Sequence, residues 1–175
     1  MNIQKKTHSL VLGGVIAALY VALTYTQETL LPGTTSMAVQ FRLSEALTLL
    51  AVFTPAAIPG LTVGCLLANI VSVSALPVDM IFGSVATLLA VLCMYKLRSI
   101  TFRGLPILSA VMPAIFNGVI IGMEIEIFFI EGGFHFGSFL TQAACVALGE
   151  IGVCMTLGLL LVKIIRNKKL EKYLI

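Results

Sequence analysis

Long apolar segments, almost free of charged residues, follow one another along the whole chain. A helix that crosses a membrane needs about 20 consecutive, mainly apolar residues. Of the 175 residues, 59% are hydrophobic and only 11% are charged, whereas a soluble domain carries roughly 25% charged residues. The sequence therefore predicts an all-α integral membrane protein, with room for five or six crossings joined by short loops.

The breaks between the apolar runs predict a compact bundle of six transmembrane helices in a single membrane domain, residues 1–175. The expected helices cover residues 9–26, 39–53, 56–73, 78–95, 105–123 and 138–165. The second is short for a full crossing, so we expect it to be tilted or to begin below the membrane surface. Pro32 and Gly33 predict a turn in a loop over residues 27–38, and Thr54 and Pro55 are expected to start the third helix.

The N-terminal apolar run continues to Tyr25 without a convincing cleavage site, so we expect a helix rather than a signal peptide. Loops rich in Lys and Arg mark the cytoplasmic side of a membrane protein. Six crossings with both termini in the cytoplasm place every basic residue except Arg42 on that side: Lys5, Lys6, Lys96, Arg98, Arg103, Lys163, Arg166, Lys168, Lys169 and Lys172. The net charge of +3 is then a topology signal in a multi-pass protein of the plasma membrane, and no nucleic-acid partner is expected.

Polar residues inside the predicted spans are the candidates for function, because such groups are costly in a bilayer and usually face a bundle interior or a cavity. The run VQFRLSEALTLL (residues 39–50) holds two of them, Arg42 and Glu45, on one helical face. Under the predicted topology the outer half of the bundle holds Arg42, Glu45, Asn69, Asp79 and Glu124, and Asn117 and Glu150 lie deeper. The excess of carboxylates and amides over cations favours a ligand that is rich in hydrogen-bond donors or positively charged.

Several of these residues also have a structural interpretation. Arg42 and Glu45 can neutralise one another, and Asp79 stands where a carboxylate caps a helix. Glu150 can be a protonated carboxyl group hydrogen-bonded to a neighbouring helix. Because carboxylates inside a membrane usually mark a pathway or a site, we favour a ligand role for Glu150.

The segment EIEIFFIEGGFHFGS (residues 124–138) combines acidic residues with several phenylalanines. We expect this loop to fold back over the bundle. Phe134 and His135 are then candidates for a lid that stacks on a flat ligand, although phenylalanines in membrane loops are at least as often interface anchors.

Gly14, Ala18 and Ala22 recur at intervals of four in the first helix and form a smooth stripe, where another helix can approach closely. Spacing alone favours packing inside the bundle over docking of a separate subunit. Gly60, Gly64 and Ala68 form a second stripe of this kind.

Motifs for catalysis are absent from the sequence. Without a GxxxxGK[ST] loop the chain cannot hydrolyse ATP by that route, and neither GxSxG nor HExxH occurs. The four cysteines sit in apolar runs without metal-ligand spacing, and the isolated His8 and His135 do not form a metal site. We therefore expect neither an enzyme nor a bound metal or cofactor.

The run VQFRLSEALTLLAVFTPAAIPGLTVGCLLANI, continued by DMIFGSVATLLA, resembles the QueT family. The resemblance extends from GGVIAALYVALT through Ala90, and beyond it depends on the helix pattern and on Asn117, Glu124 and Glu150. It implies a substrate-binding S component of an energy-coupling factor (ECF) transporter, which captures queuine or a 7-deazaguanine queuosine precursor from outside. A guanine-like edge offers N–H donors that carboxylates and amides accept.

The resemblance also implies partners: a membrane T component and two cytoplasmic ATPase subunits. Related S components dock the T component through a small-xxx-small motif on the first helix, and Gly14 and Ala18 stand at that place. The usual motif has alanine at both positions, and glycine also permits close approach.

Three alternatives stay open from the residues. The chain is an S component for another vitamin-sized ligand, a stand-alone proton-coupled carrier with Glu150 as the proton site, or a structural membrane protein. The carrier hypothesis is weakened because the sequence shows no clear inverted repeat of the kind that many secondary carriers have.

Overall fold

The structure of the protein is a computed structural model that describes residues 3–34, 40–72 and 75–174. In chain order its helices are α1 (Ile3–Leu30), η1 (Leu43–Val52), α2 (Ala57–Val71), α3 (Pro77–Leu97), α4 (Ile107–Phe128), α5 (Phe136–Val153), η2 (Cys154–Gly158), α6 (Leu159–Asn167) and η3 (Leu170–Tyr173). η1 and η3 are 3-10 helices, and η2 is a π-helical turn between α5 and α6. The predicted all-helical fold is confirmed for the described residues.

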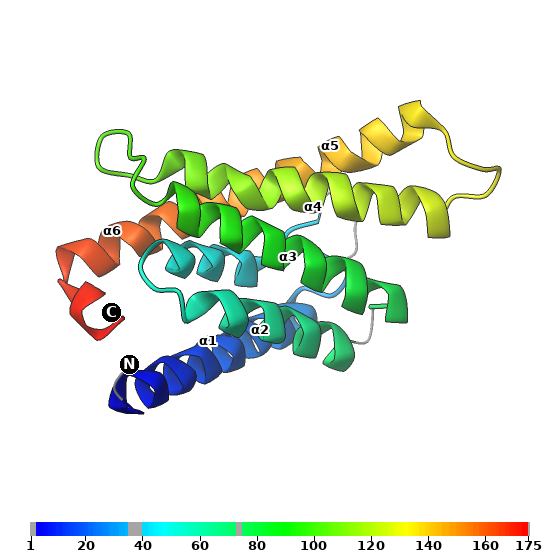
Figure 1. Cartoon of the computed structure of the whole chain (residues 1–175). Coiled ribbons are helices and arrows are strands. Elements are labelled where there is room, and N and C mark those ends of the chain that lie inside the picture. The colour runs from blue at the N-terminus through cyan, green and yellow to red at the C-terminus, as the bar shows by residue number, and fades with distance from the viewer. Residues whose placement is uncertain (1–2, 35–39, 73–74, 175) are drawn as a thin grey trace.

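Helices α1 to α5 pack in chain order, each against the next, around the short helix η1 (Figure 1). η1 contacts all six α-helices, and most of its residues are buried. A helix that is apolar on nearly every side is stable only in an interior. The run that carries Arg42 and Glu45 therefore supplies the centre of the bundle, although residues 35–39, at its start and in the preceding loop, lie outside the described part of the chain.

Four helical stretches are long and apolar enough to cross a membrane: Ile3–Leu30, Pro77–Leu97, Ile107–Phe128 and Phe136–Asn167. The last joins α5, η2 and α6 into one span. η1 and α2 are apolar but have only 10 and 15 residues. At 1.5 Å per residue α2 is about 22 Å long, less than the roughly 30 Å of hydrocarbon in a bilayer. Each predicted segment thus contains a helix, and among the described residues four of them have the length of a full crossing.

Helix α1 continues to Leu30, so the prediction of a loop from residue 27 is wrong at its start. Gln27 is buried on α1 because its amide is fully used by the chain that follows. Its Nε2 donates to Thr34 Oγ1 at 2.9 Å and to the Phe41 carbonyl, and its Oε1 accepts from Leu43 N at 2.8 Å. These bonds satisfy a polar side chain that would otherwise favour a loop.

Helix α4 likewise continues past its predicted end to Phe128, which places Glu124 and Glu126 on the helix rather than in the loop. There Glu126 Oε1 accepts a hydrogen bond from His135 N at 2.8 Å, whereas its buried Oε2 has no hydrogen-bond partner among the described residues. Helix α2 begins at Ala57, whereas the sequence predicts Pro55 as the first helical residue. The Thr54 hydroxyl accepts from the following turn, at Ala56 N, instead of capping the helix.

Small residues let α1 and α2 approach closely. A Cβ atom on Gly60 would come within 2.6 Å of the Gly13 carbonyl oxygen, and one on Gly64 within 2.9 Å of Tyr20 Cβ. Ala17 also lies against Gly64. The second predicted stripe is therefore used for packing inside the bundle.

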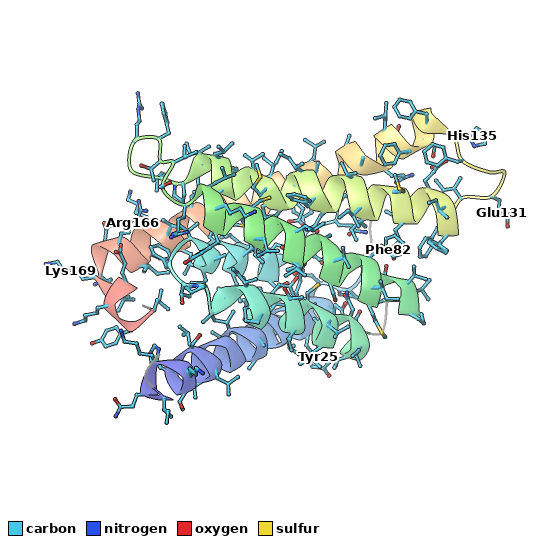
Figure 2. All side chains as sticks on the ribbon, in the orientation of Figure 1. Tyr25, Phe82, Glu131, His135, Arg166 and Lys169 are labelled. Carbon is cyan, nitrogen blue, oxygen red and sulfur yellow. The ribbon has the colours of Figure 1, made fainter. Side chains whose placement is uncertain are left out.

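The two chain ends lie at the same end of the bundle (Figure 1), which we call the terminal end. Arg166 and Lys169 are found there, whereas Glu131 and His135 lie at the opposite end, the loop end (Figure 2). This arrangement agrees with an orientation in which both termini share one side of the membrane.

Candidate functional site

Glu45 is the buried carboxyl group at the centre of the candidate site. It lies on η1 and is 1% exposed, and its Oε1 accepts a hydrogen bond from the Tyr20 hydroxyl of α1. Its Oε2 has no hydrogen-bond partner among the described residues. A buried acceptor without a partner costs about 1–3 kcal/mol, and more when it is charged. The Oε2 atom is thus available to an N–H or O–H donor of a ligand.

Arg42 is not on the helical face that the sequence predicts. It has an extended backbone, with φ −110° and ψ 104°, and immediately precedes η1. The part of the chain that the structure describes contains one ion pair, Arg166 with Glu171 at 3.8 Å, so the predicted direct pair with Glu45 is not formed. Arg42 instead interacts electrostatically with Glu45, Glu124 and Glu150. It serves as a shared countercharge for buried carboxyl groups on different helices.

Glu150 meets Asn117 between α5 and α4. Asn117 Nδ2 donates to Glu150 Oε1 at 2.9 Å, and both side chains are buried. The Cys154 thiol, one turn further along, lies 4.0 Å from Glu150 Oε2 and 3.7 Å from the Glu45 carbonyl oxygen. The hydrogen bond to a neighbouring helix that the structural interpretation predicts is therefore present at Oε1, and Cys154 connects this pair to η1.

The backbone around Glu150 is shaped to bring α5 close to the centre. Gly149 packs so tightly on the Gln40 carbonyl that a Cβ atom would overlap it. The π-helical turn Cys154–Gly158 follows directly, and at its end Gly158 packs on the Leu49 side chain. Turns of this type are frequent at functional sites, where they redirect side chains within a helix.

Glu124 and Asp79 form a second group of carboxyl groups, on α4 and α3. Glu124 is 0% exposed, and within the described ranges neither of its oxygens has a hydrogen-bond partner. Its carboxyl group interacts electrostatically with that of Asp79. Asp79 Oδ2 accepts from Leu76 N at 2.6 Å, which confirms the predicted capping role, and Asn69 Nδ2 donates to the Asp79 carbonyl at 2.9 Å. Glu124 thus has the Asp79 carboxyl group as its neighbour and accepts no N–H donor within the described ranges.

Five parts of the chain contribute to what we call the polar cluster: Arg42, Glu45, Asn69, Asp79, Asn117, Glu124 and Glu150. Hydrogen bonds and electrostatic interactions link them in the pairs described above. The cluster holds four carboxyl groups and a single guanidinium group, so it is electrostatically suited to a cation or to a neutral molecule with several N–H donors.

The polar face of α1 was not predicted. Tyr20, Thr24 and Gln27 are all buried, and Thr24 Oγ1 donates to Ser44 Oγ of η1 at 2.8 Å. Their spacing of four and three residues is the available signal, because it puts the three side chains on one side of an otherwise apolar helix. With Tyr20 bound to Glu45, this face joins α1 directly to the polar cluster.

Phe134 and His135 are not brought into the polar cluster. Both are exposed in the loop between α4 and α5, and His135 points away from the helices at the loop end (Figure 2). The Phe134 ring packs on Phe139, with 5.9 Å between centroids, and His135 Nδ1 lies 2.8 Å from the Gly133 carbonyl oxygen.

The predicted stripe Gly14, Ala18 and Ala22 faces outwards along α1. A Cβ atom on Gly14 would meet nothing within 4 Å. The prediction from spacing alone, that this stripe packs inside the bundle, is therefore wrong. Gly13 and Ala17, each one residue earlier in the chain, pack against α2 instead. A groove of about 660 Å³ runs beside Gly14 between α1 and α2.

Comparison with known proteins identifies a family. The model of the QueT transporter family matches residues 10–167. A queuosine precursor transporter QueT from Lactococcus lactis subsp. cremoris (strain MG1363) is 38% identical over 88 residues, which cover 49% of this chain and 48% of that protein. The match thus spans about half the length of that curated relative. No solved structure matches the chain.

Proposed function

The chain belongs to the QueT transporter family, and from this premise we propose that it is the substrate-binding S component of an ECF-type ABC importer. Its substrate is queuine or a 7-deazaguanine precursor of queuosine, captured from outside the cell. In this proposal the protein resides in the plasma membrane with both termini in the cytoplasm. The basic residues at the terminal end support that orientation.

The observation that carries the proposal is a set of buried carboxyl oxygens that accept no N–H donor from the described residues. Glu45 Oε2 and both oxygens of Glu124 lack partners in the described part of the chain. A guanine-like edge presents adjacent N–H donors, which a carboxylate accepts in a bidentate manner. Arg42, close to Glu45, supplies donors for the carbonyl oxygen of the same edge. The ligand would therefore satisfy groups that are costly when left alone.

We assign Glu124 and Asp79 to the substituent at the 7-position of the ligand. An aminomethyl group there is a cation, and the two neighbouring carboxyl groups would stabilise it. Asn117 and Glu150 would complete the wall between the two ends of the ligand, with Asn69 holding the start of α3 in place. Phe134 and His135 are proposed to close over the site only when ligand is bound.

Transport would require partners, because the sequence has no phosphate-binding loop for ATP. We propose that a membrane T component docks on the exposed stripe Gly14, Ala18 and Ala22, and that two cytoplasmic ATPase subunits energise uptake. The smooth outer face of α1 supports this docking site, since small residues allow close approach of a helix within the bilayer.

Ligand binding to the purified protein in detergent tests the proposal. The panel is queuine, the 7-aminomethyl and 7-cyano deazaguanines, guanine, riboflavin, thiamine and biotin, measured by calorimetry and thermal shift. A ligand at a hundredfold excess over its Kd stabilises the protein by about 2.7 kcal/mol. We expect a deazaguanine to do so, and Glu45→Gln and Glu150→Gln to abolish the effect. Glu171→Gln, at the terminal end, is the matched control and should bind normally.

Stabilisation by a vitamin would retain the S-component role and reject the substrate. If a well-folded sample binds no member of the panel, the proposed function is rejected, and the carrier and structural hypotheses take its place.

A further inference from the structure

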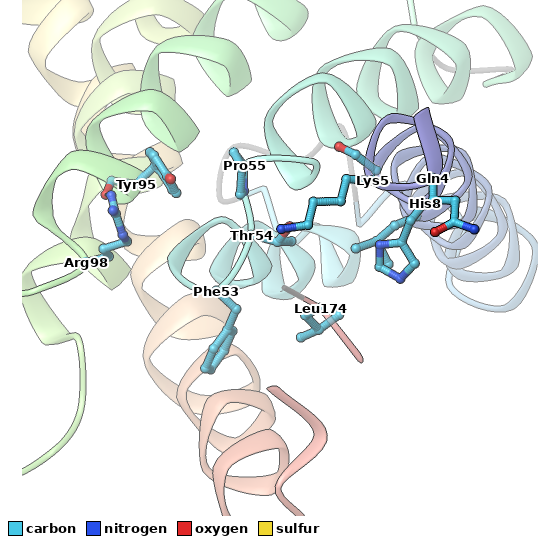
Figure 3. Close-up of a pocket in the computed structure, with 11 residues that line it drawn as sticks. Gln4, Lys5, His8, Phe53, Thr54, Pro55, Tyr95, Arg98 and Leu174 are labelled. Atoms are coloured by element: carbon cyan, nitrogen blue, oxygen red, sulfur yellow. The ribbon is translucent and has the colours of Figure 1, made fainter. Parts of the chain in front are cut away.

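A second cavity lies at the terminal end of the bundle (Figure 3). It has a volume of about 740 Å³ and is formed by the start of α1, the turn between η1 and α2, the end of α3 and residue Leu174. None of the residues of the polar cluster lines it. We call it the terminal groove.

The charged side chains around the terminal groove are cationic. Lys5 and Arg98 line it together with His8, and the described residues that form it include no Asp or Glu. Figure 3 shows Lys5 extending from α1 towards Thr54, with Tyr95 and Arg98 on the other side of the groove. Cationic groups thus approach the same space from two different helices.

Arg98 is held in position by its own helix. Its Nη1 donates to the Tyr95 carbonyl at 2.7 Å, and its guanidinium carbon lies 3.8 Å from the centre of the Tyr95 ring. A guanidinium group has five N–H donors, so most remain for a ligand. Lys5 has no ion pair in the part of the chain that is described. The groove therefore presents an oriented cation and a free one.

The rest of the lining is apolar. Leu12, Phe53 and Leu174 lie beside the cationic residues. A soluble anion would gain nothing from these side chains, whereas a lipid has a phosphate group joined to a glycerol backbone and acyl chains. Basic pockets between membrane helices bind anionic headgroups, and the groove lies at the start of the long apolar span Ile3–Leu30, where headgroups are located.

We propose that the terminal groove binds the phosphate headgroup of an anionic phospholipid from the leaflet at the terminal end. Lys5 and Arg98 contact the phosphate from α1 and α3, and the apolar lining accommodates the glycerol backbone. The bound lipid joins the ends of two helices that lie on either side of the groove. This inference does not depend on the identity of the transported substrate.

Native mass spectrometry of the full-length, delipidated protein tests the inference. Phosphatidylglycerol and phosphatidylcholine are titrated separately into wild type, into Lys5→Gln/Arg98→Gln, and into Lys168→Gln/Lys169→Gln. The last variant loses the same charge from exposed residues at the same end that do not line the groove. A basic residue near an anionic lipid contributes roughly 5-fold in affinity, so we expect about 25-fold weaker phosphatidylglycerol binding in the groove variant.

The control variant is expected to bind phosphatidylglycerol nearly as tightly as wild type, because Lys168 and Lys169 do not line the groove. An equal loss in both variants would show diffuse attraction rather than a site, and would overturn the inference. Equal binding of phosphatidylcholine and phosphatidylglycerol by wild type would also overturn it, whatever the variants do. A further arm adds inorganic phosphate: displacement of the lipid at millimolar concentration would mean that the groove is a site for soluble phosphate instead.

Discussion

Tyr20→Phe removes one oxygen atom from the interior and leaves the Glu45 carboxyl group without its hydrogen bond. Tyr20 is 1% exposed and donates to Glu45 Oε1, and Glu45 Oε2 already lacks a partner in the described part of the chain. No water can replace the lost donor at so buried a position without a rearrangement. The substitution therefore isolates the contribution of a single bond between α1 and η1.

A buried acceptor that is left without its partner costs about 1–3 kcal/mol, so we expect a loss of about 2 kcal/mol in the free energy of unfolding. For a chain of this size about 2 kcal/mol corresponds to a fall in Tm of roughly 4–8 °C. Thermal unfolding in detergent, without ligand, measures it. Ligand affinity should fall as well, because the carboxyl group is no longer oriented.

Tyr25→Phe is the matched control. Tyr25 lies on the same helix and is 56% exposed, and surface substitutions usually change stability by less than about 0.5 kcal/mol. If Tyr20→Phe and Tyr25→Phe lower the Tm equally, the bond to Glu45 contributes nothing, and the argument for an organised polar cluster fails.

Three further predictions follow from the same geometry. Gly60→Ala forces a Cβ atom onto the Gly13 carbonyl and should destabilise the protein by about 1–3 kcal/mol in thermal unfolding. The control Gly14→Ala places a Cβ atom that meets nothing within 4 Å and should leave stability unchanged. Equal destabilisation by both substitutions would contradict the packing of α1 on α2. Glu124→Gln should leave stability unchanged or slightly higher but weaken binding of the 7-aminomethyl deazaguanine at least about tenfold in calorimetry. The neutral 7-cyano compound is the control ligand. An equal loss of affinity for both ligands would refute the assignment of Glu124 to the 7-substituent. Gly14→Leu should abolish co-purification with the T component while ligand binding stays normal, and retained co-purification would exclude the stripe as the docking site.

The positions of the helices could be predicted because bilayer thickness sets the length of an apolar segment. The convergence of Glu45, Asn117 and Glu150 could be predicted for a related reason, since polar groups inside a span avoid lipid. The hydrogen-bond partner of Glu45 could not, because a tyrosine in an apolar helix has no distinctive pattern until its spacing from Thr24 and Gln27 is considered.

The direction of the small-residue stripes on α1 could not be predicted from spacing. Gly13 and Ala17 are four residues apart, and so are Gly14 and Ala18. Neighbouring residues on a helix are turned by about 100° relative to each other, so the two pairs face different sides. The packing of Gly60 against Gly13 and of Gly64 against Ala17 shows which side is inside. The extended backbone at Arg42 is likewise a result of packing around η1, since its sequence surroundings suit a helix.

Helix α1 has two sides with different neighbours: Tyr20 and Thr24 are hydrogen-bonded to η1, while Gly14 and Ala18 are exposed. A helix of 28 residues moves largely as a rigid rod. A shift of η1 when Glu45 changes hydrogen-bond partners would therefore also move the side of α1 that carries Gly14 and Ala18. If a membrane partner binds that side, the two events are thermodynamically linked. If the partner changes the affinity for the ligand by some factor, the ligand must change the affinity for the partner by the same factor. Loading and assembly then become a single equilibrium, and measuring either one reports on the other.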